Sequence, residues 1–133
     1  FTDHGPNVSA SENAANPHYE PSAEKPRRIV TGDVLLIDLW ATKQQPGAMW
    51  ADQTYMAVVG EPTPKQREVW AAIRDARDAA IALLSTKLAA GASVQGREAD
   101  AAARAVIVER GYGQYFTHRT GHSIDARGLH GMG

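Results

Sequence analysis

The sequence predicts a mixed α/β (α+β) domain in which an antiparallel β-hairpin is followed by two helices and a histidine-bearing strand and loop. The hairpin is indicated by two runs of β-favouring residues, at 34–40 and 50–59. The helices are indicated by apolar residues that recur at three- and four-residue steps through 69–88 and 99–107. In the last segment, 114–131, repeated glycines argue against a third helix.

Composition limits the classes of function. The chain has 133 residues, 43% of them hydrophobic, with 14 Lys and Arg against 15 Asp and Glu, so it is typical of a soluble globular domain or part of one. Its nearly neutral, interspersed charge argues against nucleic acid or an anionic membrane as a partner. The absence of cysteine excludes disulfides, thiolate zinc sites and a cysteine nucleophile, and fits a cytoplasmic location. Carboxylates and five histidines remain as the chemical groups.

Two further features concern membrane or export segments and the two ends of the chain. No apolar run approaches the ~20 residues of a membrane-spanning helix, and the N-terminus does not resemble a signal peptide. The chain opens with Phe1, has no methionine before Met49, and stops at a glycine-rich end. We therefore expect a single partial domain over 1–133 that is a fragment of a longer protein.

The first 28 residues contain four prolines and no sustained period of two or 3.6, which predicts a loop. Within it, Pro17 precedes His18, and proline restricts the backbone where the imidazole leaves the chain. The alternative for His18 is an ordinary solvated side chain.

Asp38 interrupts the first apolar run. With the two-residue period of a strand, Val34, Leu36, Asp38 and Trp40 share one face, so the carboxylate projects among large apolar side chains. A carboxylate in such a place needs a partner.

Asp52 shares a face of the second strand with Thr54 and Met56. If this is also the face of Asp38, the two carboxylates approach each other in one pocket. Then either one pKa rises, as in a general acid/base pair, or a divalent cation lies between them. In the alternative, the two side chains face apart; the spacing leaves both arrangements open.

Two helices are predicted between the hairpin and the last segment. Thr63, Pro64 and Gln66 form a capping-box pattern, and Gly91 ends the first helix. The second helix runs from about Gln95 to Arg110. The residues expected on the core side of the first helix are Val69, Ile73, Ala76, Ala80 and Leu84, with Trp70, Ile81 and Leu88 beside them. Those of the second helix are Ala99, Ala103, Val106 and Ile107.

The last segment contains three of the five histidines: His118, His122 and His130. Because glycines argue against a helix here, His118 and His122 do not form the helical His pair of zinc proteases. They would instead be presented by an extended segment next to the two carboxylates. Oxygen and nitrogen ligands together suit manganese, iron, cobalt or zinc. For His118 the alternative is a buried histidine whose ring bonds to the backbone.

Four motifs occur in an order that resembles one family. They are Asn-Ala-Ala-Asn-Pro-His-Tyr from Asn13, Leu-Ile-Asp-Leu around Asp38, Ala-Asp-Gln-Thr around Asp52, and His-Arg-Thr-Gly-His-Ser-Ile from His118. This order resembles the M24 metallopeptidases of the creatinase-like, or pita-bread, fold, above all aminopeptidase P and prolidase. The resemblance extends from about Asn13 to the C-terminus.

The resemblance implies a site for two divalent metal ions, with manganese preferred and cobalt, zinc or iron as alternatives. Asp38 would supply the first carboxylate, Asp52 a carboxylate shared by both ions, and His122 an imidazole on one ion. In the family two glutamates from later strands complete the site, and this sequence ends at Gly133 before either. The 133-residue chain is therefore expected neither to bind a metal pair tightly nor to catalyse by itself.

The implied activity is hydrolysis of peptide bonds next to proline by a water molecule that the metals activate. His18 and His130 are the implied catalytic histidines, His18 as a hydrogen-bond donor or proton shuttle at the reacting bond. His118 and His130 would line the proline-side pocket, where His118 would bind substrate. The expected partners are a peptide or dipeptide substrate and, as an open alternative, a second copy of the full-length protein.

Two positions depart from the family pattern: Trp40 and Asp125 each stand where glycine is usual. These substitutions bear on the shape of the substrate pocket. Three other functions remain as alternatives: a non-hydrolytic enzyme of the same fold, a peptide-binding protein without activity, and a methionine aminopeptidase.

Overall fold

The computed structural model describes residues 5–16 and 18–131, which form two compact units. The sheet unit comprises 5–62 together with 124–131, and the helix unit comprises 63–123. Each unit is described by itself below.

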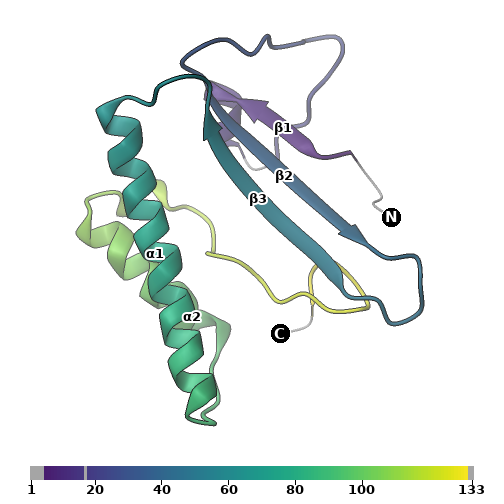
Figure 1. Ribbon diagram of the computed structural model, residues 1–133, viewed down its shortest axis with the longest axis vertical. Helices are drawn as coiled ribbons and strands as arrows, with labels where there is room; N and C mark the ends of the chain where they lie inside the picture. The colour runs from purple at the N-terminus through teal and green to yellow at the C-terminus, as the bar shows by residue number, and fades with distance from the viewer. Residues whose placement is uncertain (1–4, 17, 132–133) are drawn as a thin grey trace. The chain divides into compact units, whose positions relative to one another are not determined.

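The sheet unit contains a three-stranded antiparallel sheet in the order β1-β2-β3 (Figure 1). Its strands are β1 (Asn7–Ala10), β2 (Val34–Thr42) and β3 (Trp50–Val58). β2 and β3 form the predicted hairpin, with Val34 opposite Val58 at one end and Thr42 opposite Trp50 at the other. The connecting turn includes Gly47, whose φ of 73° is a conformation that favours glycine.

The predicted loop over 1–28 is wrong in part. β1 lies within it and pairs with β2, and the short 3-10 helix η1 (Ser11–Ala15) follows directly. Four residues are too few to show a two-residue period, and β1 exists because the outer edge of β2 offers hydrogen-bonding partners. β1 is therefore determined by its pairing with β2, and no local sequence pattern marks it.

Asp33 connects three parts of the sheet unit at the start of β2. Its carboxylate is buried and accepts hydrogen bonds from the Arg27 guanidinium at 2.8 Å, the Ser11 hydroxyl at 2.6 Å and the Val30 backbone N–H at 2.8 Å. The hydrogen bond from Arg27, followed by those from Ser11 and Val30, lowers the pKa of Asp33 well below its usual range. These hydrogen bonds fix η1 and the loop that contains Arg27 and Val30 to the start of β2.

The helix unit contains α1 (Pro64–Ala89) and α2 (Gly96–Glu109). The predicted capping box of α1 is confirmed: Thr63 accepts from the Gln66 backbone N–H, and the Gln66 side chain accepts from the Thr63 N–H. Gly91 and Gly111 follow the two helices with φ of 66° and 83°, the left-handed conformation common after helix ends. No helix in the described part of the chain is both long and apolar enough to cross a membrane.

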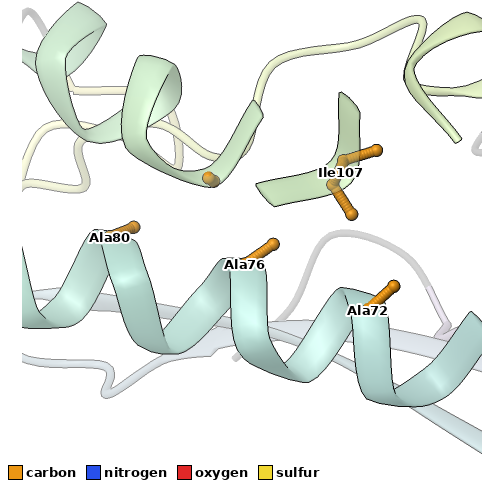
Figure 2. Packing of buried hydrophobic residues seen from close by; sticks show 5 residues of the cluster. Ala72, Ala76, Ala80 and Ile107 are labelled. Atoms are coloured by element: carbon orange, nitrogen blue, oxygen red, sulfur yellow. The ribbon is translucent and has the colours of Figure 1, made fainter. Parts of the chain in front are cut away.

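The buried core of the helix unit is made mostly of alanine. Figure 2 shows Ala72, Ala76 and Ala80 on α1 beside Ile107 on α2, and Ala103 completes the cluster. Small side chains let the two helix backbones approach each other closely. The core positions predicted for α2 are confirmed, because Ala103 and Ile107 are buried and the other two pack against them.

Four of the apolar positions predicted for the core side of α1 are wrong. Exposed fractions of 52% to 65% are found for four side chains that recur at helical spacing: Trp70, Ile73, Ile81 and Leu88. The buried stripe of α1 runs through Ala72, Ala76 and Ala80 instead. The Arg74 guanidinium lies 5.0 Å from the centre of the Trp70 ring.

After α2 the chain forms the short 3-10 helix η2 (Gly113–Tyr115), and 116–131 contains neither helix nor strand. The histidine-bearing segment is thus not the strand predicted from its composition. A strand needs a neighbour for its backbone groups, and in this segment several of those groups bond to side chains of α2 instead.

Candidate functional site

Asp38 and Asp52 lie on the same face of the β2–β3 pair. Asp38 is opposite Thr54 and Asp52 is opposite Trp40, and directly opposed residues of an antiparallel pair project to one side. Since Asp38 and Trp40 are two residues apart on one strand, all four side chains share that face. The sequence left two arrangements open, and the register selects the one in which the carboxylates are diagonal neighbours.

Thr54 is the partner that the Asp38 carboxylate was expected to need. Its hydroxyl donates to Oδ1 of Asp38 at 2.7 Å, and Asp38 is half-buried. Asn7 of β1 lies opposite Asp38 on the other side, so Asn7, Asp38 and Thr54 form a polar row across three strands. Nothing in the sequence pattern pointed to Asn7, because its contact depends on the pairing of β1 with β2. The two-residue period places Thr54 on the face of Asp52 but gives it no role.

The carboxylate face fits one part of a divalent-metal site. Two acidic side chains on one face repel each other unless a proton or a cation compensates, and carboxylate oxygens are ligands for hard and borderline divalent ions. Among 5–16 and 18–131 there is no group of three or more His, Cys, Asp or Glu side chains that could hold a metal ion. Asp38 and Asp52 belong to the sheet unit and His122 to the helix unit, so their convergence stays a prediction.

His122 and His118 each use one ring nitrogen locally. Nδ1 of His122 lies 3.1 Å from the Ser123 carbonyl oxygen, and Nδ1 of His118 lies 2.8 Å from that of Arg119. A carbonyl oxygen only accepts, so Nδ1 carries the proton in both rings. In a neutral ring Nε2 then holds the lone pair, which is the form that binds a metal ion or accepts a proton.

Side chains of α2 hold the backbone that carries these histidines. The Arg104 guanidinium donates to the carbonyl oxygens of Phe116 at 2.8 Å and His118 at 2.9 Å. Asp100 accepts from the backbone N–H of Thr120 at 2.7 Å and from its hydroxyl at 2.9 Å. The Thr120 N–H, followed by Arg104, lowers the pKa of Asp100, so the carboxylate is ionised at neutral pH. Nothing in the sequence pattern distinguished Asp100 and Arg104 from a solvated helix face.

The two remaining candidate histidines lie on exposed parts of the sheet unit. The backbone N–H of His18 donates to the side-chain oxygen of Asn16 at 3.0 Å, which fixes a tight turn at this residue. Pro17, which was expected to orient His18, lies outside the described residues. His130 is also exposed. Roles for His18 and His130 stay predictions.

Comparison with known proteins then assigns the family. The model of metallopeptidase family M24 matches residues 1–132 of this chain. The chain belongs to metallopeptidase family M24. This confirms the resemblance based on the four motifs, and it makes the α/β elements described above part of that family's fold.

Several relatives of this chain carry names that describe the cleavage of bonds next to proline. The chain is 38% identical over 117 residues to an Xaa-Pro dipeptidase of Lactobacillus delbrueckii subsp. lactis, a match that covers 88% of this chain and 28% of the relative. It is 33% identical to an Xaa-Pro dipeptidase of Pyrococcus horikoshii, with 88% of this chain and 30% of the relative covered.

Solved structures give the same result for the fold. The prolidase from Pyrococcus furiosus superposes with a TM-score of 0.71 at 30% identity, over 94% of this chain and 33% of that structure. The X-Pro aminopeptidase from Thermotoga maritima superposes with a TM-score of 0.73, also at 30% identity, over 94% and 32%. The M24 chain described here thus spans about a third of the length of the proteins it matches.

Proposed function

We propose that this M24 chain forms part of the catalytic domain of a metal-dependent exopeptidase that hydrolyses peptide bonds next to proline. The observation that carries the proposal is the shared face of Asp38 and Asp52 in a chain similar to Xaa-Pro dipeptidases. The substrate would be a dipeptide or a longer peptide. We further infer that the protein works in the cytoplasm and prefers manganese, with cobalt, zinc or iron as alternatives.

Asp38, Asp52 and His122 are the residues that would hold the metals. Two divalent ions, when bound, would lower the pKa of a water molecule so that it attacks the peptide carbonyl near neutral pH. Thr54 keeps one oxygen of Asp38 in a hydrogen bond at 2.7 Å and so limits the rotation of that carboxylate. The Nδ1 contact of His122 selects the tautomer that can bind an ion through Nε2.

The other histidines would act on the substrate. His118 would contact the peptide through Nε2, because its Nδ1 is directed to the Arg119 carbonyl. His18 would donate a hydrogen bond at the reacting carbonyl or pass a proton to the leaving nitrogen. His130 would act from the proline side of the same pocket. All three side chains are exposed, as contact with a substrate requires.

Replacing Asp52 tests the proposal in the complete natural protein. Asp52→Asn keeps the size of the side chain but removes its charge, so we expect kcat/KM on a proline-containing peptide to fall by about a thousandfold. The melting temperature should change little, because Asp52 is only half-buried in β3. The measurement is cleavage of the peptide in buffer with added manganese.

Asp78→Asn is the matched control, because Asp78 is an exposed carboxylate on α1 that pairs with Arg77 on the same helix. It should keep the parental activity. Near-normal activity of Asp52→Asn would count against the proposed function. Comparing a dipeptide with a longer peptide, and a proline substrate with a methionine-initiated one, separates the prolidase, aminopeptidase P and methionine aminopeptidase alternatives.

A further inference from the structure

We propose that Asp100 and Arg104 of α2 are positioning residues that set the orientation of His118 toward the substrate. The inference rests on the proposed function for the role of His118. The arrangement itself lies entirely within the helix unit. Asp100 and Arg104 are one helical turn apart, and Nε of Arg104 donates to Asp100 at 3.1 Å, so the two side chains act together.

Arg104 fixes both the backbone and the ring environment of His118. Its guanidinium donates to the Phe116 and His118 carbonyl oxygens, which determines the direction of the backbone on both sides of Thr117. The same guanidinium lies 4.2 Å from the centre of the Phe116 ring. The Phe116 and His118 rings in turn meet edge to face, with centroids 5.3 Å apart and planes at 87°. Arg104 therefore contacts the Phe116 ring, and the Phe116 ring contacts the His118 ring.

Asp100 holds the other side of His118. It accepts both the backbone N–H and the hydroxyl of Thr120 through one oxygen, Oδ1. His118 is thus bracketed by anchors at residues 116, 118 and 120, all of which lead to one helix. In a segment without a strand partner, such side-chain anchors replace the ladder of hydrogen bonds that would otherwise fix the backbone.

Another arginine in the same unit provides the comparison. Arg110 donates to Asp75 at 2.6 Å and so connects the end of α2 with α1 through one Arg–Asp pair. This pair and the backbone hydrogen bond from Arg110 to the Val106 carbonyl are both remote from residues 116–122. Loss of Arg110 should therefore affect helix packing in a similar way without changing the orientation of His118.

The first test uses kinetics on the complete natural protein with manganese. Arg104→Ala and Asp100→Ala should each lower kcat/KM on a proline-containing peptide by about tenfold to a hundredfold, as expected for loss of hydrogen bonds to charged groups. Arg104→Lys should recover only part of the activity, because a compact ammonium lacks the fork of nitrogens with which the guanidinium reaches both carbonyls while contacting the Phe116 ring. Arg110→Ala should stay within about twofold of the parent.

A double-mutant cycle separates positioning from general destabilisation. If Arg104 acts through His118, adding Arg104→Ala to a His118→Ala protein should change kcat/KM by less than about twofold. Equal and additive losses in both backgrounds would overturn the proposal, as would equal activity of Arg104→Ala and Arg110→Ala.

Hydrogen exchange supplies a readout that does not need activity. Amides in 116–120 should exchange about tenfold faster in Arg104→Ala and Asp100→Ala than in the parent. In Arg110→Ala their exchange rates should equal those of the parent. If the parent cleaves no proline peptide, the proposed function fails, and this exchange pattern still decides whether Asp100 and Arg104 hold the His118 segment. Unchanged exchange in 116–120 would overturn the positioning role, whatever the activity.

Discussion

Trp40 lies directly across from Asp52 and shares a face with Asp38, so an indole borders the proposed metal site. The site would bind small peptides, and a large aromatic side chain beside its carboxylates limits the room for the substrate. Glycine is usual at this position in the family that the sequence resembles. Trp40 is therefore the residue on this face with the strongest expected effect on substrate preference.

We expect Trp40→Ala to change substrate preference more than turnover. Removing the indole should raise kcat/KM for peptides with a bulky first residue, relative to a small one, by about tenfold, the effect of filling or emptying a pocket by a few atoms. Competition between two such peptides in one reaction measures the ratio. Leu39→Ala is the control, because Leu39 points to the opposite face of β2 and is 43% exposed. An unchanged ratio in Trp40→Ala would contradict this role.

The hydrogen bonds of the Asp33 carboxylate lead to a prediction about how stability depends on pH. Its folded pKa is lowered, mainly by Arg27, so its contribution to stability is present above the unfolded pKa of about 4 and is lost as the pH falls further. Asp33→Asn should therefore lower the melting temperature by several degrees at neutral pH and by less at pH 3. Thermal unfolding monitored by circular dichroism across this range measures both. A deficit that stays constant with pH would show that the charge of Asp33 does not stabilise the fold.

At the scale of elements, local sequence determines the hairpin and the two helices. The apolar runs, the Thr63 capping box and the glycines after each helix are all short-range signals, and each is confirmed. β1 was missed because its hydrogen bonds come from β2, which is more than twenty residues away in sequence. The exposed Trp70 shows the same limit, since periodicity marks an apolar stripe but not which stripe faces a neighbour.

The candidate site divides in a similar way. Strand periodicity placed Asp38 with Trp40, and Asp52 with Thr54, but only the register between the strands shows that both pairs share a face. Asp100 and Arg104 carry no local sign of their task, because the groups they bind lie twelve to twenty residues later in the chain. Such contacts depend on the path of the backbone after α2 ends, and the local sequence of α2 does not determine that path.

The alanine contact between α1 and α2 gives a prediction about packing. Ala76 is 4% exposed and faces α2, so Ala76→Leu inserts three carbon atoms where the helices meet (Figure 2). Overpacking of this kind costs about 1–3 kcal/mol of unfolding free energy. Ala82→Leu is the control, because Ala82 is exposed on the same helix and leucine is also a good helix former. Urea denaturation measures the difference, and equal stability of both variants would mean that the contact accommodates larger side chains.

At the scale of the whole molecule, the M24 chain covers 28% to 33% of the length of the relatives named above. The resemblance implies five metal ligands, of which Asp38, Asp52 and His122 are present in this sequence. Each ligand removed from a site lowers affinity, because the ion must then keep water in place of a protein group. Metal affinity therefore measures how much of the site this stretch of chain supplies.

We expect the 133-residue chain to bind manganese weakly, with no more than one site and a dissociation constant of about 0.1 mM or above, the range of sites with few charged ligands. Isothermal titration with manganese measures the number of sites and the affinity, and circular dichroism of the same sample establishes that α1 and α2 are folded. In Asp52→Asn the residual binding should disappear, because one carboxylate and one imidazole hold a divalent ion poorly, whereas Asp78→Asn should bind as the parent does. Two tight sites in the folded 133-residue chain would mean that side chains other than Asp38, Asp52 and His122 complete the metal centre.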